Sequence, residues 1–283
     1  MIRIAAGVCS RSTATRGVFC RGFASSTSGF LQLERCDSGV CIVKMNKKPV
    51  NTFDIAMMNE FASTIETLEN DPGVSSLVLT SAFDGIFCAG LDLKYLHKPT
   101  EAEFTEFWST FEGMWAKYYT TSLSTVALIN GTSPALGAVL SLASDYRVMV
   151  NNEKYRFGLN ETSLGMVPPL WLQAMTERTL GARGAEFHLQ FSSMLSPKDA
   201  AKVGYVDELC GDVDAALQAS VSKCIAMSKI PEGARSAYKM HLRQPVVEKS
   251  GPESVKMMAD NILGDEFQTT IQNVLDQLMA KKK

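Results

Sequence analysis

Short apolar runs alternate with longer amphipathic segments over the first two thirds of this chain, and this alternation is the feature that most limits its fold. The runs are rich in β-branched residues and bounded by turn residues, so they predict strands. They cover residues 40–45, 75–80, 125–129, 146–150 and 204–209. Between them, residues 55–69 and 101–119 place apolar side chains at helical spacing. Strands that alternate with helices predict parallel βαβ units and therefore an α/β protein.

Beyond Pro168 the pattern changes to one helix after another. The predicted helices cover residues 170–180, 183–190, 197–203, 213–228, 233–242 and 253–279, the last of them interrupted near Gly264. We therefore expect an α/β core over residues 28–210 and a helical region over residues 211–283. In a chain of this size such a region often packs on a neighbouring subunit.

The N-terminal segment has the composition of a mitochondrial transit peptide. It is rich in Ser, Thr and Ala, it has no acidic residue before Glu34, and its arginines are spread along it at positions 3, 11, 16 and 21. Such a basic segment, without a long apolar centre, favours mitochondrial import over secretion. We expect residues 1–27 to be the transit peptide and the mitochondrial matrix to be the destination. The alternative is an N-terminal tail that carries no address.

Composition excludes several classes of function. The formal net charge is −2, which gives no electrostatic basis for binding nucleic acid. The longest apolar runs, such as residues 135–143, are far shorter than the ~20 residues of a membrane-spanning helix. The 7 cysteines and 3 histidines show no metal-ligand spacing, so we expect no metal site.

Glu161 is the first candidate catalytic residue. It stands among apolar residues and glycines in the stretch from Phe157 to Met166, directly after a predicted strand end. Burial in such surroundings raises the pKa of a carboxyl group, and a general base works best when its pKa lies near the working pH. The alternative is that Glu161 caps the next helix or forms a salt bridge there.

Two turns rich in small residues could supply backbone donors. Residues 86–93 follow a strand and are predicted to open a helix, so N–H groups near Leu91 point outward. In residues 130–137 a strand ends at Asn130 and a helix is predicted to start near Pro134. Two helix N-termini aimed at one carbonyl oxygen form an oxyanion hole, in which each donor stabilises the transition state by ~3 kcal/mol. The alternative is that the small residues serve only close packing.

Taken together and in order, four motifs resemble the crotonase superfamily, and within it the enoyl-CoA isomerase branch. The motifs are Ala89 to Asp92, Asn130 to Ala135, Asp145 to Arg147 and Gly158 to Glu161, and the likeness runs from about Leu31 to the C-terminus. The resemblance implies an α/β spiral of ββα units and a C-terminal helical region used to assemble a homotrimer. It also implies an acyl-CoA thioester as substrate and no separate cofactor, because CoA is part of the substrate.

The resemblance assigns roles to individual residues. Glu161 would be the base, Asn160 would position the acyl group, and the N–H groups of Leu91 and Leu136 would hold the thioester oxygen. The further substrate-binding residues would be Ala89, Gly90, Asp92 and Leu93, whose backbone groups line the adenine site, together with Gly137 and Trp171.

Two departures from the family pattern bear on the reaction. Hydratases of the superfamily use two glutamates, and the position of the first is occupied here by Val139. One carboxylate suffices to move a double bond, so we expect conversion of 3-enoyl-CoA esters, cis or trans, to 2-trans-enoyl-CoA in the β-oxidation of unsaturated fatty acids. The second departure is Leu136, where isomerases usually have glycine, so that Gly137 is an alternative donor.

Three other readings stay open. The chain could be a hydratase or an acyl-CoA hydrolase in which another acid, Asp92 or Glu153, supplies the second function. It could also be a catalytically silent member of the fold that only binds acyl-CoA.

Overall fold

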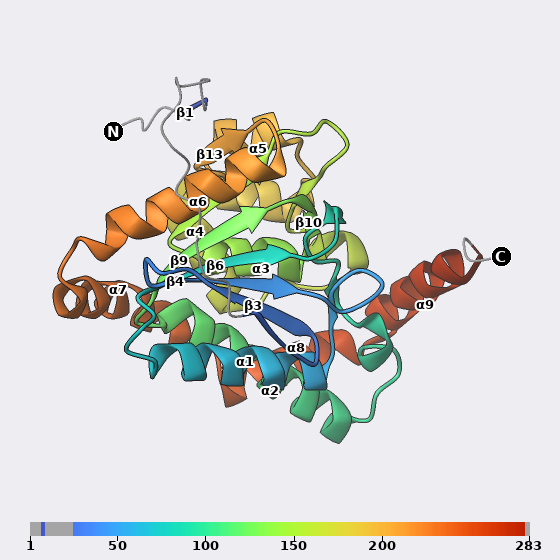
Figure 1. Ribbon diagram of the computed structural model, residues 1–283. Helices are drawn as coiled ribbons and strands as arrows, with labels where there is room; N and C mark the ends of the chain where they lie inside the picture. The colour runs from blue at the N-terminus through green and yellow to red at the C-terminus, as the bar shows by residue number, and fades with distance from the viewer. Residues whose placement is uncertain (1–6, 9–24, 281–283) are drawn as a thin grey trace.

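The computed structural model describes residues 7–8 and 25–280, and its centre is an eight-stranded sheet (Figure 1). The strand order is β1-β13-β11-β9-β6-β4-β3-β2. The strands from β1 to β4 in this order run parallel, and β3 and β2 are antiparallel additions at one edge. Their bounds are Gly7–Val8 (β1), Ser25–Ser28 (β2), Leu31–Arg35 (β3), Val40–Met45 (β4), Ser76–Ser81 (β6), Ser124–Ile129 (β9), Tyr146–Val150 (β11) and Glu208–Cys210 (β13).

Helices cover both faces of this sheet, which explains why its central strands read as almost unbroken apolar runs. Successive strand residues point to opposite faces. Ile42, Val78 and Val126 pack against α6 (Val213–Ser228). Their neighbours in the strands pack in a larger core on the other face, with α1 (Ile55–Glu69), α2 (Glu101–Thr120) and α3 (Leu136–Ala143). In Figure 1, α6 lies above the sheet and α1 and α2 lie below it.

Most of the predicted elements are confirmed, several of them to the residue. The strands 40–45 and 146–150 and the helices 55–69, 197–203 and 213–228 have the bounds that the sequence predicts. Local capping explains this accuracy. Asp54 accepts a hydrogen bond from the Met57 N–H at the start of α1 (2.9 Å), and Thr100 forms a capping box with Glu103 at the start of α2.

Outside the segments around Leu91 and Pro134, two predicted elements differ from the structure by several residues. The strand predicted over residues 204–209 begins only at Glu208, because Gly204 has a φ of 95° and ends α5 (Pro197–Val203) as its left-handed cap. The helix predicted over residues 233–242 is longer and spans Glu232–Val247 (α7).

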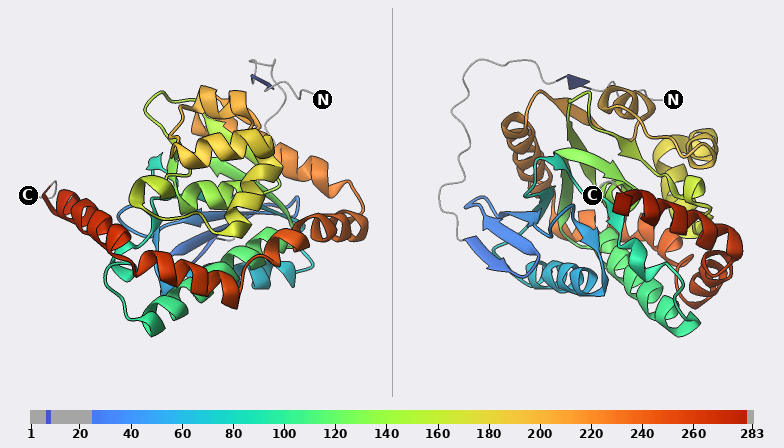
Figure 2. Two further views of the ribbon diagram at one scale, coloured as in Figure 1. Left: turned by 180° about the vertical axis from the view of Figure 1, so that it is seen from behind. Right: turned by 90° about the vertical axis from the view of Figure 1, so that its right-hand side faces the viewer.

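The remaining interruptions between helices lie at or near glycine residues, as the sequence predicts. The helix α4 (Leu170–Gln190) contains Gly181 with non-helical angles (φ 75°, ψ 163°), between the two predicted helices. The C-terminal segment is divided near Gly264 into α8 (Pro252–Ile262) and α9 (Asp265–Ala280). Figure 2 shows α9 extending away from the body of the molecule at the C-terminal end.

The predicted division of the chain stays a prediction. Of the proposed transit segment, residues 1–6 and 9–24 lie outside the described residues. The boundary at residue 210 separates strands from helices along the chain, although α6 packs directly on the sheet. Within the described part, every helix is too short or too polar to span a bilayer.

A largely buried ionic cluster fastens α7 to the sheet. The Lys239 ammonium lies 2.9 Å from Asp145 Oδ2, and the Arg243 guanidinium lies 2.8 Å from Oδ1. Burial lowers the pKa of Lys239 to about 8. Burial alone would raise the pKa of Asp145, but the charges of Lys239 and Arg243 bring it below its usual value. The carboxylate is therefore ionised in the folded protein and compensates two cations at once.

We expect Asp145→Asn to lower the free energy of unfolding by about 3 kcal/mol, because it leaves the buried Lys239 and the partly buried Arg243 without a counter-charge. Urea unfolding followed by circular dichroism measures this loss. The matched control is Glu153→Gln, which removes an exposed ion pair with Lys198 and should cost less than about 1 kcal/mol. Equal losses in the two variants would contradict the prediction.

Candidate active site

A second, three-stranded sheet brings the three predicted site segments together. Its strands are β7 (Gly85–Ile86), β10 (Gly131–Pro134) and β12 (Phe157–Gly158), in the order β12-β10-β7, and all are parallel. The carboxyl ends of parallel strands lie at the same edge of a sheet. The turn after β7, the start of α3 after β10 and the segment with Glu161 after β12 therefore meet at one edge.

The first turn is held from both sides. The Phe87 N–H donates to the Thr132 carbonyl (3.0 Å), and the Ala89 N–H donates to the Val50 carbonyl (3.0 Å). The next residues form β8 (Gly90–Leu91), which pairs in parallel with β5 (Thr52–Phe53).

The prediction that this turn opens a helix at Leu91 is wrong. Leu91 pairs with Phe53 in the short sheet of β5 and β8, and this pairing keeps the backbone extended. Only one turn of 3₁₀ helix follows, η1 (Leu93–Tyr95), with Asp92 as its cap. The next α-helix begins at Glu101.

The second turn begins α3 with a strained residue. Ala135 has a φ of 46° and a ψ of −119°, and its side chain caps nothing. Pro134 ends β10, so the helix starts at Leu136, two residues later than Pro134 predicts. The N–H groups of Leu136 and Gly137 lie in the first turn, where an α-helix offers no backbone acceptor. Strain of this kind commonly marks a functional site.

The two turns lie in direct contact, and glycine makes this possible. A Cβ atom on Gly137 would lie 2.7 Å from the Cys88 carbonyl oxygen, and one on Gly90 would lie 3.5 Å from the Ala135 Cβ. Any larger residue at position 137 would push α3 away from the first turn. The glycine that follows Leu136 is therefore needed for packing, whichever N–H serves as donor.

Glu161 is buried at the start of η2 (Glu161–Leu164) and is only 6% exposed. Its Oε2 atom has no hydrogen-bond partner among the described residues, and neither has the buried Oδ1 atom of Asn160. Burial raises the pKa of Glu161 from 4.5 to about 7. The carboxyl group can therefore exchange a proton near neutral pH, as a general base or acid must.

An apolar cavity of about 170 Å³ contains these groups. The structure brings most of the predicted residues to its wall: Ala89, Gly90, Leu91, Leu93, Leu136, Asn160, Glu161 and Trp171. Asp92 and Gly137 do not line it. Among the described residues in this wall Glu161 is the single carboxylate, and Val139 is one of its apolar neighbours. The arrangement suits a reaction in which one carboxyl group carries a proton beside backbone donors.

Comparison with known proteins identifies the family of this chain. The model of the enoyl-CoA hydratase/isomerase family matches residues 35–281. The chain belongs to this family. It is 36% identical to the mouse protein enoyl-CoA delta isomerase 1, mitochondrial, over 250 residues, which are 87% of this chain and 86% of the mouse protein. The human protein of the same name is 32% identical over 249 residues, with 87% and 82% of the two chains covered.

A solved structure confirms the predicted crotonase fold with C-terminal helices. The crystal structure of human mitochondrial delta3-delta2-enoyl-CoA isomerase superposes on this chain with a TM-score of 0.86 at 30% sequence identity. The match covers 90% of this chain and 100% of the human one. The chain is thus an enzyme-family member of the crotonase type, similar to enoyl-CoA delta isomerase over almost its whole length.

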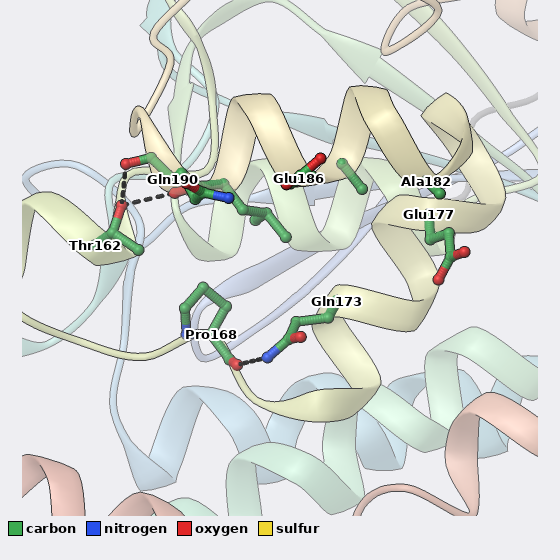
Figure 3. Close-up of a pocket in the computed structure, with 9 residues that line it drawn as sticks. Thr162, Pro168, Gln173, Glu177, Ala182, Glu186 and Gln190 are labelled. Carbon is green, nitrogen blue, oxygen red and sulfur yellow. Dashed lines mark hydrogen bonds between the residues drawn. The ribbon is translucent and has the colours of Figure 1, made fainter.

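A larger cavity, of about 360 Å³, lies along α4. Figure 3 shows its walls, including Thr162, Gln173, Glu177 and Glu186. The Thr162 hydroxyl is engaged in a hydrogen bond to the Leu189 carbonyl (2.7 Å). Neither donor turn of this crotonase lines the larger cavity, so size alone does not identify the active site. The candidate active site is the smaller cavity, which both turns and Glu161 line.

Some parts of the site gave no usable signal in the sequence. Val274 of α9 lines the cavity, but its distance along the chain from Glu161 hides this contact. Asn51 is buried with a φ of 54° and donates to the Phe87 carbonyl (3.0 Å), which supports the first turn. The only sequence signal for this support is the residue type, because asparagine adopts a positive φ more readily than most other residues. Within the described residues no three His, Cys, Asp or Glu side chains gather as a metal site.

We expect Glu161→Gln to stabilise the crotonase fold above pH 7. The folded-state pKa of Glu161 is raised from 4.5 to about 7, so the native state binds more protons than the unfolded chain between these values. Native stability therefore falls as pH rises through this window, and glutamine removes that loss. Urea midpoints of the two proteins should agree below pH 4.5 and separate as pH rises. A wild-type midpoint equal to or above the variant's above pH 7 would contradict this.

Proposed function

We propose that this crotonase is an enoyl-CoA delta isomerase that converts 3-cis- or 3-trans-enoyl-CoA to 2-trans-enoyl-CoA. The observation that carries the proposal is a single buried carboxylate, Glu161, in an apolar cavity between two turns that can present backbone N–H groups. The similarity to proteins named enoyl-CoA delta isomerase supports it.

In the proposed mechanism Glu161 removes a proton from C2 of the substrate. The electron pair of that C–H bond spreads into a dienolate, whose negative charge lies mainly on the thioester oxygen. The N–H groups of Leu91 and Leu136 stabilise this oxygen. Protonated Glu161 then returns the proton to C4, so the double bond between C3 and C4 is replaced by one between C2 and C3. The carboxylate is regenerated and no other reactant is consumed.

The pKa of Glu161 suits both halves of this cycle. A carboxyl group with a pKa about 7 is a stronger base than an exposed glutamate, and it still gives the proton up after the transfer. Apolar walls keep bulk water from competing for the dienolate. Asn160 and Trp171 are proposed to orient the acyl group beside the carboxylate, since both line the cavity.

Val139 favours isomerisation over hydration. It is buried and lines the cavity, at the position that the resemblance assigns to the first glutamate of hydratases. An isopropyl side chain can neither hold a water molecule nor transfer a proton. Asp92 and Glu153, the acids considered as substitutes, do not line the cavity.

The cellular setting follows as part of the same proposal. An isomerase of this type lets unsaturated fatty acids enter β-oxidation, and we propose that it acts in the mitochondrial matrix. The composition of residues 1–27 supports import, and similar proteins from mouse and human are named as mitochondrial. Assembly into a homotrimer remains a prediction from the resemblance.

We expect Glu161→Gln to reduce isomerisation roughly 10³-fold, because the step loses its only base. The measurement is the ultraviolet absorbance of the conjugated thioester formed from 3-enoyl-CoA. The matched control is Glu177→Gln, which alters a carboxylate of the larger cavity and should leave the rate unchanged. Retention of most of the activity by Glu161→Gln would remove this residue from the mechanism.

Assays of the wild-type protein distinguish the alternative functions. With 2-enoyl-CoA as substrate, formation of 3-hydroxyacyl-CoA would identify a hydratase, and release of free CoA thiol would identify a hydrolase. Thermal stabilisation by acyl-CoA without any turnover would identify a silent binder. Only conversion of 3-enoyl-CoA to the conjugated isomer supports the proposal.

We expect kcat/KM for 3-enoyl-CoA to rise with pH, to reach half of its maximum near pH 7 and to level off above it. Glu161 must be ionised to accept the proton, and burial raises its pKa to about 7. Below that value kcat/KM should fall about tenfold for each pH unit. Initial rates at low substrate concentration, measured in buffers of constant ionic strength, give the profile. A midpoint near the ordinary glutamate value would show that another group limits the rate.

A further inference from the structure

Glu112 is a buried carboxylate that the proposed mechanism does not use. It lies in α2, is 3% exposed and accepts hydrogen bonds from its own helix and from two other parts of the fold. Its Oε1 atom accepts from the indole N–H of Trp108 (3.1 Å) and from that of Trp171 (2.8 Å). The hydroxyl of Ser254 donates to the same oxygen (2.6 Å).

The second oxygen of Glu112 extends this connection to α8. The Gly251 N–H, at the start of that helix, donates to Oε2 (2.7 Å). One side chain therefore joins α2, α4 and the start of α8. A buried carboxylate is held in place when several donors satisfy its oxygens, and removal of its acceptors leaves those donors buried without partners.

The two indoles held by Glu112 are part of the cavity wall. Trp108 and Trp171 both line the cavity that contains Glu161, and Phe111 lines it between them. The Phe111 ring meets each indole edge to face, at centroid distances of 5.2 and 5.7 Å. Trp115 stacks behind Trp171 at 4.0 Å. The wall is thus a packed aromatic layer.

The hydrogen-bond pattern separates the three tryptophans by position. Trp115 does not line the cavity, and its indole nitrogen has no hydrogen-bond partner among the described residues. The two tryptophans that do line the cavity both donate to Glu112. A ring whose N–H is fixed in this way cannot turn aside without losing a buried hydrogen bond.

We propose that Glu112 is a positioning residue that fixes Trp108 and Trp171 and so limits the length of acyl chain that the cavity accepts. The inference rests on the proposed function only in taking the cavity to hold an acyl chain. An acyl chain that reaches the indoles can extend further only if a ring moves. Glu112 resists that movement through bonds on the far side of the wall from the reacting carbons.

Three variants test this. Glu112→Met has a similar volume but accepts none of the four hydrogen bonds. Glu112→Gln is the conservative variant, because its amide oxygen can still accept the hydrogen bonds of the two indoles. Glu69→Gln is the matched control. Glu69 is the last residue of α1 and forms an ion pair (2.7 Å) with Lys117, which lies near the end of α2, the helix of Glu112. Glu69 does not line the cavity.

The measurement is the dissociation constant of saturated acyl-CoA esters, from butanoyl-CoA to dodecanoyl-CoA, determined by titration calorimetry. In the wild type, affinity should rise with chain length and stop where the chain meets the indoles. In Glu112→Met the affinity should continue to rise beyond that length. For the first longer ester, the affinity relative to that of butanoyl-CoA should be about tenfold higher in the variant than in the wild type. Glu112→Gln and Glu69→Gln should match the wild-type ratio within about twofold.

Two results would overturn the inference. One is an unchanged length dependence in a folded Glu112→Met protein. The other is an equal change in Glu69→Gln, which would show that general loosening of α2 suffices. If Glu112→Met does not fold, Glu112→Asp replaces it, because its carboxylate is one methylene too short to reach both indoles.

The binding test separates this inference from the proposed function. Saturated esters bind without reacting, so a wild-type protein that binds them but does not isomerise 3-enoyl-CoA contradicts the proposed function alone. A protein that isomerises while Glu112→Met keeps the wild-type length dependence contradicts the role of Glu112 alone. A wild-type protein that binds none of the esters contradicts both.

Discussion

The parallel pairing of β10 with β7 on one side and β12 on the other is the interaction on which the site depends. Ser133 pairs with Phe157, and Thr132 pairs with Ile86. These few contacts set the backbone donors after β7 and β10 beside the carboxylate that follows β12. Three segments separated by many residues in the chain become neighbours because parallel strands end at a common edge. A shift of register in β10 would move the start of α3 away from both of the other segments.

The site concentrates features that a stable fold normally avoids. Ala135 has a positive φ, and Glu161 has a buried oxygen without a partner among the described residues. Each of these features costs folding free energy and is tolerated because the surrounding core is extensive. The ionic cluster at Asp145 and the carboxylate of Glu112 differ, because donors or counter-charges satisfy them. The carboxylate proposed to react is thus left without a partner for one oxygen, whereas Asp145 and Glu112, which hold helices together, are satisfied.

Local sequence signals predicted five of the eight strands of the main sheet and most helices, since caps, glycines and apolar periodicity act over a few residues. They were insufficient for the short strands of the site. The helix predicted at Leu91 does not form there, because pairing with Phe53 extends the backbone. Pro134 is a favoured first helical residue, yet it belongs to β10, whose pairing with Gly158 delays α3. In both places a contact with a distant strand overrides a local preference.

By itself, the sequence determined that Glu161 would be a lone carboxylate in an apolar setting, and that small residues would allow two turns to approach it. These properties belong to side-chain chemistry and short-range backbone preference. Only the tertiary structure decided that the turns touch at Gly137, that Val274 closes the same cavity, and that Glu112 holds its aromatic wall. Such contacts join residues far apart in the chain, and their geometry depends on how whole strands and helices pack.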